Sequence, residues 1–243
     1  MSSLFNTLLR TVILDDSAYR EWRERPNVFL RGIVLILIVS LIAGLVGFGM
    51  RLVSEVQPVD ADEIREGIRE SFEMQRQFNP GFQDPEVYEM AEEMVDTIVA
   101  MIVDIANIRP PLPVGVAGFF SALGAWLTGA LSSIGGWLFY GALVLVAVNL
   151  LGGSAKLRDF YGTVAVFSIP GLIGLLGPIP CVGGILVFLG TIWGIVMYVK
   201  ATSVATGLDI GRSVVAVLAP FVILLLLALA LTILFVLWMV IIF

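Results

Sequence analysis

The longest apolar pattern in the chain runs from Phe160 to Val199 and contains no charged residue. Runs of this length indicate segments that lie in a lipid bilayer, because a soluble core does not require them. Pro170 interrupts the first half, and the sequence Gly177-Pro178-Ile179-Pro180 divides the run into two parts. We therefore expect two membrane helices, at about 160–177 and 181–200, joined by a tight proline turn.

Three further apolar segments extend this pattern. Residues 28–50 predict a first membrane helix, which is too long and too far along the chain for a cleaved signal peptide. Residues 213–243 predict the last one. The uncharged segment 114–151 would be about 57 Å long as a single helix, far more than a bilayer needs. We expect a break at Ser132–Gly136, with an interfacial or re-entrant helix before it and a crossing from about Gly135 to Leu151 after it. Two full crossings are the alternative.

The polar segments have a different pattern. Residues 1–14 place apolar side chains on one helical face, either in the membrane interface or packed on other protein. Asp15 or Asp16 is expected to cap a second short helix that ends at Pro26. Residues 51–113 form an acidic insert, in which Asp84-Pro85-Glu86 is a typical helix start. A small helical hairpin on the membrane is expected there.

Composition agrees with a membrane protein, since 58% of the residues are hydrophobic, 14% are charged and the mean hydropathy is +0.99. The predicted fold is all-α, a polytopic membrane helix bundle of five transmembrane helices with a small helical extracytoplasmic insert. Its parts are a cytoplasmic amphipathic N-terminal segment (1–27), the first transmembrane helix (28–50), the acidic insert (51–113), and a four-helix membrane core with a preceding interfacial helix (114–243).

The charge distribution predicts the orientation. With a cytoplasmic N-terminus and five crossings, the basic residues inside are Arg10, Arg20, Arg23, Arg25, Arg31, Lys156, Arg158, Lys200 and Arg212. Most of the acidic residues fall in the insert outside. An excess of Lys and Arg on the cytoplasmic side is typical of membrane proteins. A sixth crossing would place Lys156 and Arg158 outside, so five crossings are favoured.

The sequence offers no catalytic constellation. It contains no histidine, which is the commonest general base and metal ligand, and Cys181 is its one cysteine. There is no phosphate loop, no dinucleotide fingerprint and no basic stripe for nucleic acid. We expect no catalytic residue, no metal ligand, no organic cofactor and no nucleic-acid partner.

Acidic residues of the insert are the first candidates for a site. Glu89, Glu92, Glu93 and Asp96 share one predicted helix face and could gather a divalent cation, although a solvated acidic face is the favoured interpretation. Asp104 is flanked by apolar residues. We expect it at the membrane interface near Arg109, rather than as a functional acid within the bilayer.

The membrane segments hold three further candidates. Asn149 is expected to hydrogen-bond a neighbouring helix or loop rather than a substrate. Pro170, which follows Ser168, frees the carbonyl of Val166 and predicts a kink, which can build a binding site in a transporter. Gly190 and Gly194 lie four residues apart, and we expect them to pack against another helix of this chain, with Trp193 facing lipid or a partner.

Several motifs together resemble a known family. They are Tyr19-Arg20-Glu21-Trp22, Arg25-Pro26-Asn27, Leu151-Gly152-Gly153, Phe160-Tyr161, Pro170, the 177–180 turn, Trp193 and the segment from Gly207 to Ala216. This pattern is similar to the Yip-domain family, the Ypt/Rab-interacting integral membrane proteins, and especially to its bacterial branch. The resemblance covers residues 150 to 243 and, more loosely, the first helix.

The resemblance implies five membrane helices and a cytoplasmic N-terminus. In the eukaryotic branch it also implies vesicle traffic through Rab-type GTPases, by way of an N-terminal Asp-Leu-Tyr-Gly-Pro type motif. This sequence lacks that motif before its first membrane helix, so we do not carry GTPase binding over. The expected function is a non-enzymatic membrane scaffold in the bacterial plasma membrane, which binds lipid and either a membrane protein or a second copy. The alternative is a transporter or channel for a small solute at the Pro170 kink.

Overall fold

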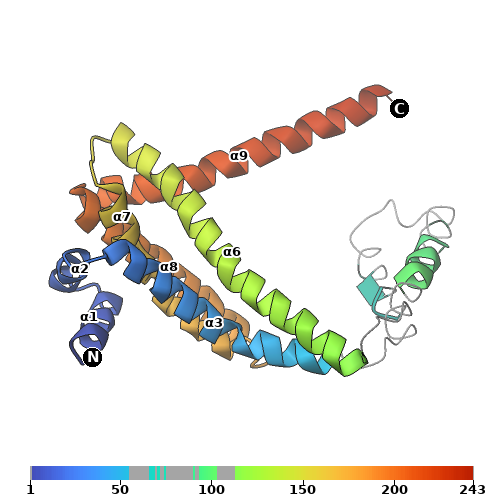
Figure 1. The fold of residues 1–243 in the computed structure, drawn as a ribbon. Coiled ribbons are helices and arrows are strands. Elements are labelled where there is room, and N and C mark those ends of the chain that lie inside the picture. Colours follow the sequence, from blue (N-terminus) through green and yellow to red (C-terminus); the bar gives the residue numbers. More distant parts are fainter. Residues whose placement is uncertain are drawn as a thin grey trace. The chain divides into compact units, whose positions relative to one another are not determined.

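The computed structural model describes residues 2–54, 66–68, 70–71, 74, 90, 93–102 and 113–242 (Figure 1). Every regular element in these residues is helical. The chain divides into two compact units, one of residues 1–48 together with 125–243 and one of residues 49–124. The predicted helices of 51–113, including Asp84-Pro85-Glu86, fall largely outside the described residues. The predicted boundaries of the four parts remain expectations.

The described elements follow one another as helices from the N-terminus to the C-terminus. They are α1 (Ser2–Val12), α2 (Asp16–Arg23), α3 (Val28–Ser54), α6 (Val114–Leu150), α7 (Leu157–Val164), the 3₁₀-helix η2 (Ala165–Leu176), α8 (Gly183–Thr206) and α9 (Ile210–Ile242). Five stretches are long and apolar enough to cross a bilayer: Val28–Ser54, Gly115–Leu150, Leu157–Leu176, Gly183–Thr206 and Ile210–Met239. The predicted all-α membrane bundle of five transmembrane helices is confirmed.

The segment predicted to break at Ser132–Gly136 does not break. Residues Val114–Leu150 form one continuous α-helix. The hydroxyl of Ser133 donates to the carbonyl of Gly129 within the same helix, at 3.0 Å, so this serine does not compete with the helix for its backbone. Glycine is also common in transmembrane helices. The predicted division into an interfacial helix and a separate crossing is therefore wrong.

The expected kink at Pro170 is also absent. Residues 165–176 instead form a 3₁₀-helix that contains Pro170. In this geometry each N–H bonds the carbonyl three residues earlier, so the missing donor of Pro170 frees the carbonyl of Phe167 rather than that of Val166. A 3₁₀-helix rises about 2.0 Å per residue, so these twelve residues cover about 24 Å of depth.

The turn residues after η2 and α8 have defined roles. Gly177-Pro178-Ile179-Pro180 connects η2 to α8, as predicted, and the N–H of Gly183 bonds the carbonyl of Ile179 at 2.8 Å. At the other end, α8 stops at Gly207, whose φ of 74° is left-handed and therefore favours glycine. Its N–H donates to the carbonyl of Ser203 at 3.0 Å.

The core of the first unit is built from aromatic and β-branched side chains of α2, α3, α6, α7 and α8. Trp137 packs against Phe29 and Tyr161, with ring centroids 5.8 and 5.1 Å away. Tyr198 packs against Phe167 and Tyr140 at 5.3 and 5.8 Å. These offset and edge-on pairs stabilise more than their buried area alone provides.

Gly190 and Gly194 lie on a buried face of α8, as predicted. A Cβ at Gly190 would lie 3.2 Å from the carbonyl oxygen of Pro170, and one at Gly194 would lie 3.1 Å from that of Phe167. The glycines therefore let α8 approach the backbone of η2 within the same chain. Trp193 is 40% exposed, and its indole N–H donates to the carbonyl of Val12 at 3.0 Å.

This close approach gives a first testable prediction. A leucine at position 190 or 194 would force η2 away from α8, and overpacking of this kind costs about 1–3 kcal/mol. We expect Gly190→Leu and Gly194→Leu to lower the melting temperature in detergent, and the control Leu189→Ala, at a position 53% exposed, to change it much less. Glycine variants that melt like the parent but leave a larger complex would show that this face binds another chain.

Candidate functional site

A cavity of about 670 Å³ lies between α6, η2, α8 and α9. No lining residue carries a charge. They are Ser133, Gly136, Trp137, Tyr140, Phe167, Ser168, Pro170, Gly171, Gly174, Val187, Gly190, Thr191, Gly194, Ile195, Tyr198, Val217, Leu218 and Phe221. The volume is within the range of small-molecule sites. All four elements belong to predicted spans, so the cavity is embedded in the membrane region.

Three of the polar groups in the lining are already paired within their own helices. The hydroxyls of Ser133, Ser168 and Thr191 donate to the carbonyls of Gly129, Ala165 and Val187, at 3.0, 2.9 and 2.9 Å. These pairs satisfy the donors without breaking the helices. They leave the wall apolar apart from hydroxyl oxygens.

Two buried donors in the lining have no hydrogen-bond partner in the part of the chain that the structure describes. They are the hydroxyl of Tyr198, a residue 4% exposed, and the indole N–H of Trp137, a residue 2% exposed. Tyr140, by contrast, donates its hydroxyl to the carbonyl of Val217 on α9. Buried polar groups are normally paired, so unpaired donors beside a cavity indicate a place for an acceptor.

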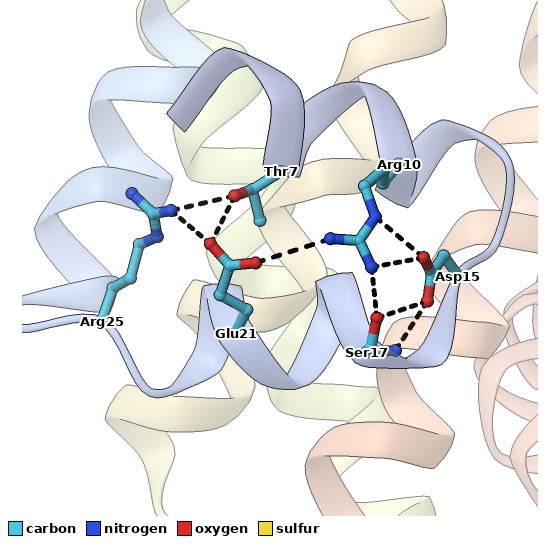
Figure 2. Close-up of polar contacts among 6 residues, drawn as sticks. All are labelled: Thr7, Arg10, Asp15, Ser17, Glu21 and Arg25. Carbon is cyan, nitrogen blue, oxygen red and sulfur yellow. Dashed lines mark hydrogen bonds and ion pairs between the residues drawn. The ribbon is translucent and has the colours of Figure 1, made fainter. Parts of the chain in front are cut away.

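The second feature of interest is the N-terminal cap, defined here as α1 and α2. Figure 2 shows how two groups of side chains join these helices. The guanidinium of Arg10 donates to Asp15 at 2.6 and 2.9 Å and also to Ser17. The carboxylate of Glu21 accepts from Thr7 and from Arg25, each at 2.6 Å.

These contacts act on both carboxyl groups. Hydrogen bonds from the Ser17 hydroxyl, and then from Arg10, lower the pKa of Asp15 to about 2. The pKa of Glu21 is also lowered, first by the hydrogen bond from Thr7 and then by that from Arg25. Asp15 also caps α2 by accepting from the Ser17 N–H at 2.9 Å, so the prediction that Asp15 or Asp16 caps this helix is confirmed.

Four side-chain contacts tie the N-terminal cap to the bundle. The indole N–H of Trp22 donates to the carbonyl of Gly162 at 2.8 Å, and Arg23 donates to that of Val204 at 2.6 Å. Asp16 pairs with Lys200 at 2.6 Å. With the bond from Trp193 to α1, these contacts place the cap beside α7 and the end of α8.

The apolar face predicted for residues 1–14 divides into two rows. Leu4, Leu8 and Val12 are partly buried and pack against the core. Phe5, Leu9 and Ile13 are 65%, 51% and 73% exposed. The helix thus packs on protein and also leaves one apolar row uncovered, so both interpretations of the sequence apply to it.

The remaining sequence candidates do not gather into a site. Glu89, Glu92, Asp104 and Arg109 lie outside the described residues, whereas Glu93 and Asp96 lie in helical turns. Within the described ranges, no three His, Cys, Asp or Glu side chains are grouped for a metal ion. The side chain of Asn149 is exposed near the end of α6, and no hydrogen bond of it is found in the described part of the chain, so the partner expected for it is not seen there.

Sequence reasoning pointed to Pro170, Ser168, Gly190 and Gly194, and the structure brings all four to the cavity. It missed the aromatic residues at one end, Trp137, Tyr140 and Tyr198. Each occurs in an uncharged helix, where a tyrosine or tryptophan is a polar group that needs a partner. That signal could have identified them.

Comparison with known proteins adds the family. A family model, the Yip1 domain, matches residues 9–233, which include the N-terminal cap, the five spans and the cavity. No curated protein and no solved structure matches the chain significantly. The match covers most of the chain, so this integral membrane protein belongs to the Yip1-domain family.

Proposed function

We propose that this protein is a non-enzymatic membrane scaffold, which binds another membrane protein or a second copy of itself through α9. The observation that carries the proposal is the course of α9 after Pro220. Every residue from Phe221 to Met239 is exposed, and Figure 1 shows this part of α9 extending away from α8. Helix association in lipid depends on close packing, so a helix that is free on all sides offers its surface to a partner helix.

The scaffold proposal can be tested by cysteine crosslinking in native membranes. In a Cys181→Ser background, single cysteines replace residues 224 to 232 of α9 one at a time. We expect crosslinks at positions that recur every three to four residues, because one face of a helix has this period. Matched cysteines at Ile185 and Phe188, exposed on α8, serve as the control. Crosslinks to the same chain identify a homo-oligomer, and crosslinks to another protein identify a partner. Absence of both from α9 would contradict the proposal.

A second candidate, a carrier for a small apolar solute, is favoured by the cavity that Pro170 helps to line. The spans carry few charges, which argues against ion or proton coupling. Solute flux into liposomes that contain the purified protein, with no crosslinking through α9, would favour the carrier over the scaffold.

The orientation gives a second testable prediction. We propose that the N-terminus is cytoplasmic in a bacterial plasma membrane, because basic residues predominate in the N-terminal cap and in the loops at 151–157 and 207–212. Impermeant thiol reagents should therefore label a cysteine at position 60 or 105 from outside. Cysteines at 156 and 212 should react only after the membrane is opened. Labelling of position 156 in intact cells would contradict the five-crossing orientation.

A further inference from the structure

The length of the cavity corresponds to one leaflet of a bilayer. Its lining residues on α8 run from Val187 to Tyr198, which is a rise of about 16 Å at about 1.5 Å per residue. The hydrocarbon core of a bilayer is about 30 Å thick, so one leaflet is about 15 Å deep. The cavity therefore has the depth that a single lipid tail occupies.

The two ends of the cavity differ in the same direction on three elements. The end toward the N-terminal cap carries Tyr140 of α6, Phe167 of η2 and Tyr198 of α8. The other end carries Ser133, Gly174 and Val187 from the same three elements. Tyrosine and tryptophan concentrate at membrane–water interfaces. The aromatic end therefore lies at the headgroup level and the other end near the middle of the bilayer.

The chemistry of the wall selects an apolar occupant. No lining residue is charged, and the hydroxyls of Ser133, Ser168 and Thr191 already donate within their own helices. A charged or strongly polar solute would lose its hydration here without gaining partners. An alkyl chain loses nothing, and it gains dispersion contacts that an empty cavity would lack.

The aromatic end provides the second, independent observation. The Tyr198 hydroxyl and the Trp137 indole N–H are buried in residues that line this end, and neither has a partner within the described residues. Both groups are donors, so they require an acceptor. The ester carbonyls of a phospholipid supply acceptors at the depth where interfacial tyrosine and tryptophan lie.

We propose that the cavity between α6, η2, α8 and α9 binds one acyl chain of a membrane phospholipid, with the ester group of the lipid at the Tyr198 end. The binding is separate from the scaffold role, since it uses side chains of a single protomer. The bound lipid belongs to the leaflet on the side of the N-terminal cap. Its chain packs between Gly136 on α6 and Thr191 on α8.

The test uses full-length protein in phospholipid vesicles that contain a phosphatidylcholine with a photoactivatable diazirine in one acyl chain. After irradiation, mass spectrometry maps the adducts. We expect adducts concentrated on residues 133–140 and 187–198. In Gly136→Leu these adducts should fall about fivefold, a ratio that corresponds to about 1 kcal/mol.

The neighbouring glycine provides a matched control. Gly135 and Gly136 are both exposed on α6, and a Cβ at either would meet no atom within 4 Å, but Gly136 lines the cavity and Gly135 does not. Gly135→Leu should therefore keep the adducts. A second pair, Thr191→Phe in the wall and Ile192→Phe outside it, repeats the comparison on α8 if Gly136→Leu does not fold.

Three results would overturn the proposal. The first is an even spread of adducts over all exposed helix faces. The second is an unchanged yield at 133–140 and 187–198 in both Gly136→Leu and Thr191→Phe. The third is crosslinking of the cavity residues to a second protein chain, which would show that a helix fills the space. Crosslinking through α9 is a separate measurement, so either proposal can fail alone.

Discussion

Replacing Trp22 with alanine is expected to destabilise the protein more than any other single change considered for the N-terminal cap. Trp22 is 2% exposed, and its indole N–H donates to the carbonyl of Gly162. Truncating a buried tryptophan to alanine costs about 3–5 kcal/mol, because the lost transfer energy adds to that of the cavity left behind. We expect a clear fall in the melting temperature of Trp22→Ala in detergent.

Two further variants separate packing from the hydrogen bond. Trp22→Phe keeps most of the ring and removes the donor, so it should cost about 1 kcal/mol, the net contribution of a typical hydrogen bond. Trp238→Ala makes the same truncation at a residue that is 57% exposed on α9. It should change the free energy of unfolding by less than about 0.5 kcal/mol. If Trp22→Ala melts like Trp238→Ala, α2 is not docked on α7 as described.

The loss of Trp22 should also act on the contacts around it. Arg23 and Asp16 flank this residue in α2 and hold Val204 and Lys200 of α8. A cap released by Trp22→Ala would free both contacts together, since they share one short helix. Limited proteolysis between α2 and α3 should therefore accelerate in Trp22→Ala and remain slow in Trp238→Ala.

The long apolar segments and the turns could be predicted from the sequence, because both depend on local features. The run from Phe160 to Val199 and the turn at 177–180 need only hydropathy and proline geometry. The cap at Asp15 needs only a side chain two residues from the N–H that it binds. Each of these features is encoded within a few residues, and the structure contains all of them.

The predictions that failed concern how helices respond to their neighbours. Length suggested that 114–151 would break, but nothing in the sequence tells whether a glycine pair in an apolar helix interrupts it. Pro170 suggested a kink, whereas the close approach of α8 through Gly190 and Gly194 accompanies a 3₁₀-helix instead. Periodicity describes one helix at a time, so it did not reveal either outcome.

The cavity illustrates the same limit. Gly190 and Gly194 could be assigned to a packed face from their spacing alone. That Tyr140 of α6 and Tyr198 of α8 would lie 5.8 Å apart, one paired to α9 and one without a partner, depends on how three helices pack. A lipid site of this kind has no sequence motif, because its wall consists of the small and aromatic residues that ordinary membrane helices also use.

The turn at 177–180 carries the last prediction, which concerns Gly183 at the start of α8. A Cβ at this position would overlap the backbone carbonyl oxygens of Gly177 and Leu176 and lie 2.6 Å from the carbonyl carbon of Gly177. Backbone atoms cannot turn away as the end of a side chain can, so the turn itself would have to shift. Alanine gains at most about 1 kcal/mol over glycine inside a helix, whereas overpacking costs about 1–3 kcal/mol and occasionally more. Gly183→Ala should therefore destabilise the protein.

The neighbouring residue gives a control that differs only in its surroundings. A Cβ at Gly184 would meet no atom within 4 Å. Gly184→Ala should therefore melt at or slightly above the temperature of the parent protein, because the better helix former adds stability without a clash. Both variants are compared by thermal unfolding in the same detergent. The order of their melting temperatures decides the matter: if Gly183→Ala melts as high as Gly184→Ala, the turn does not pack against the start of α8 as closely as described.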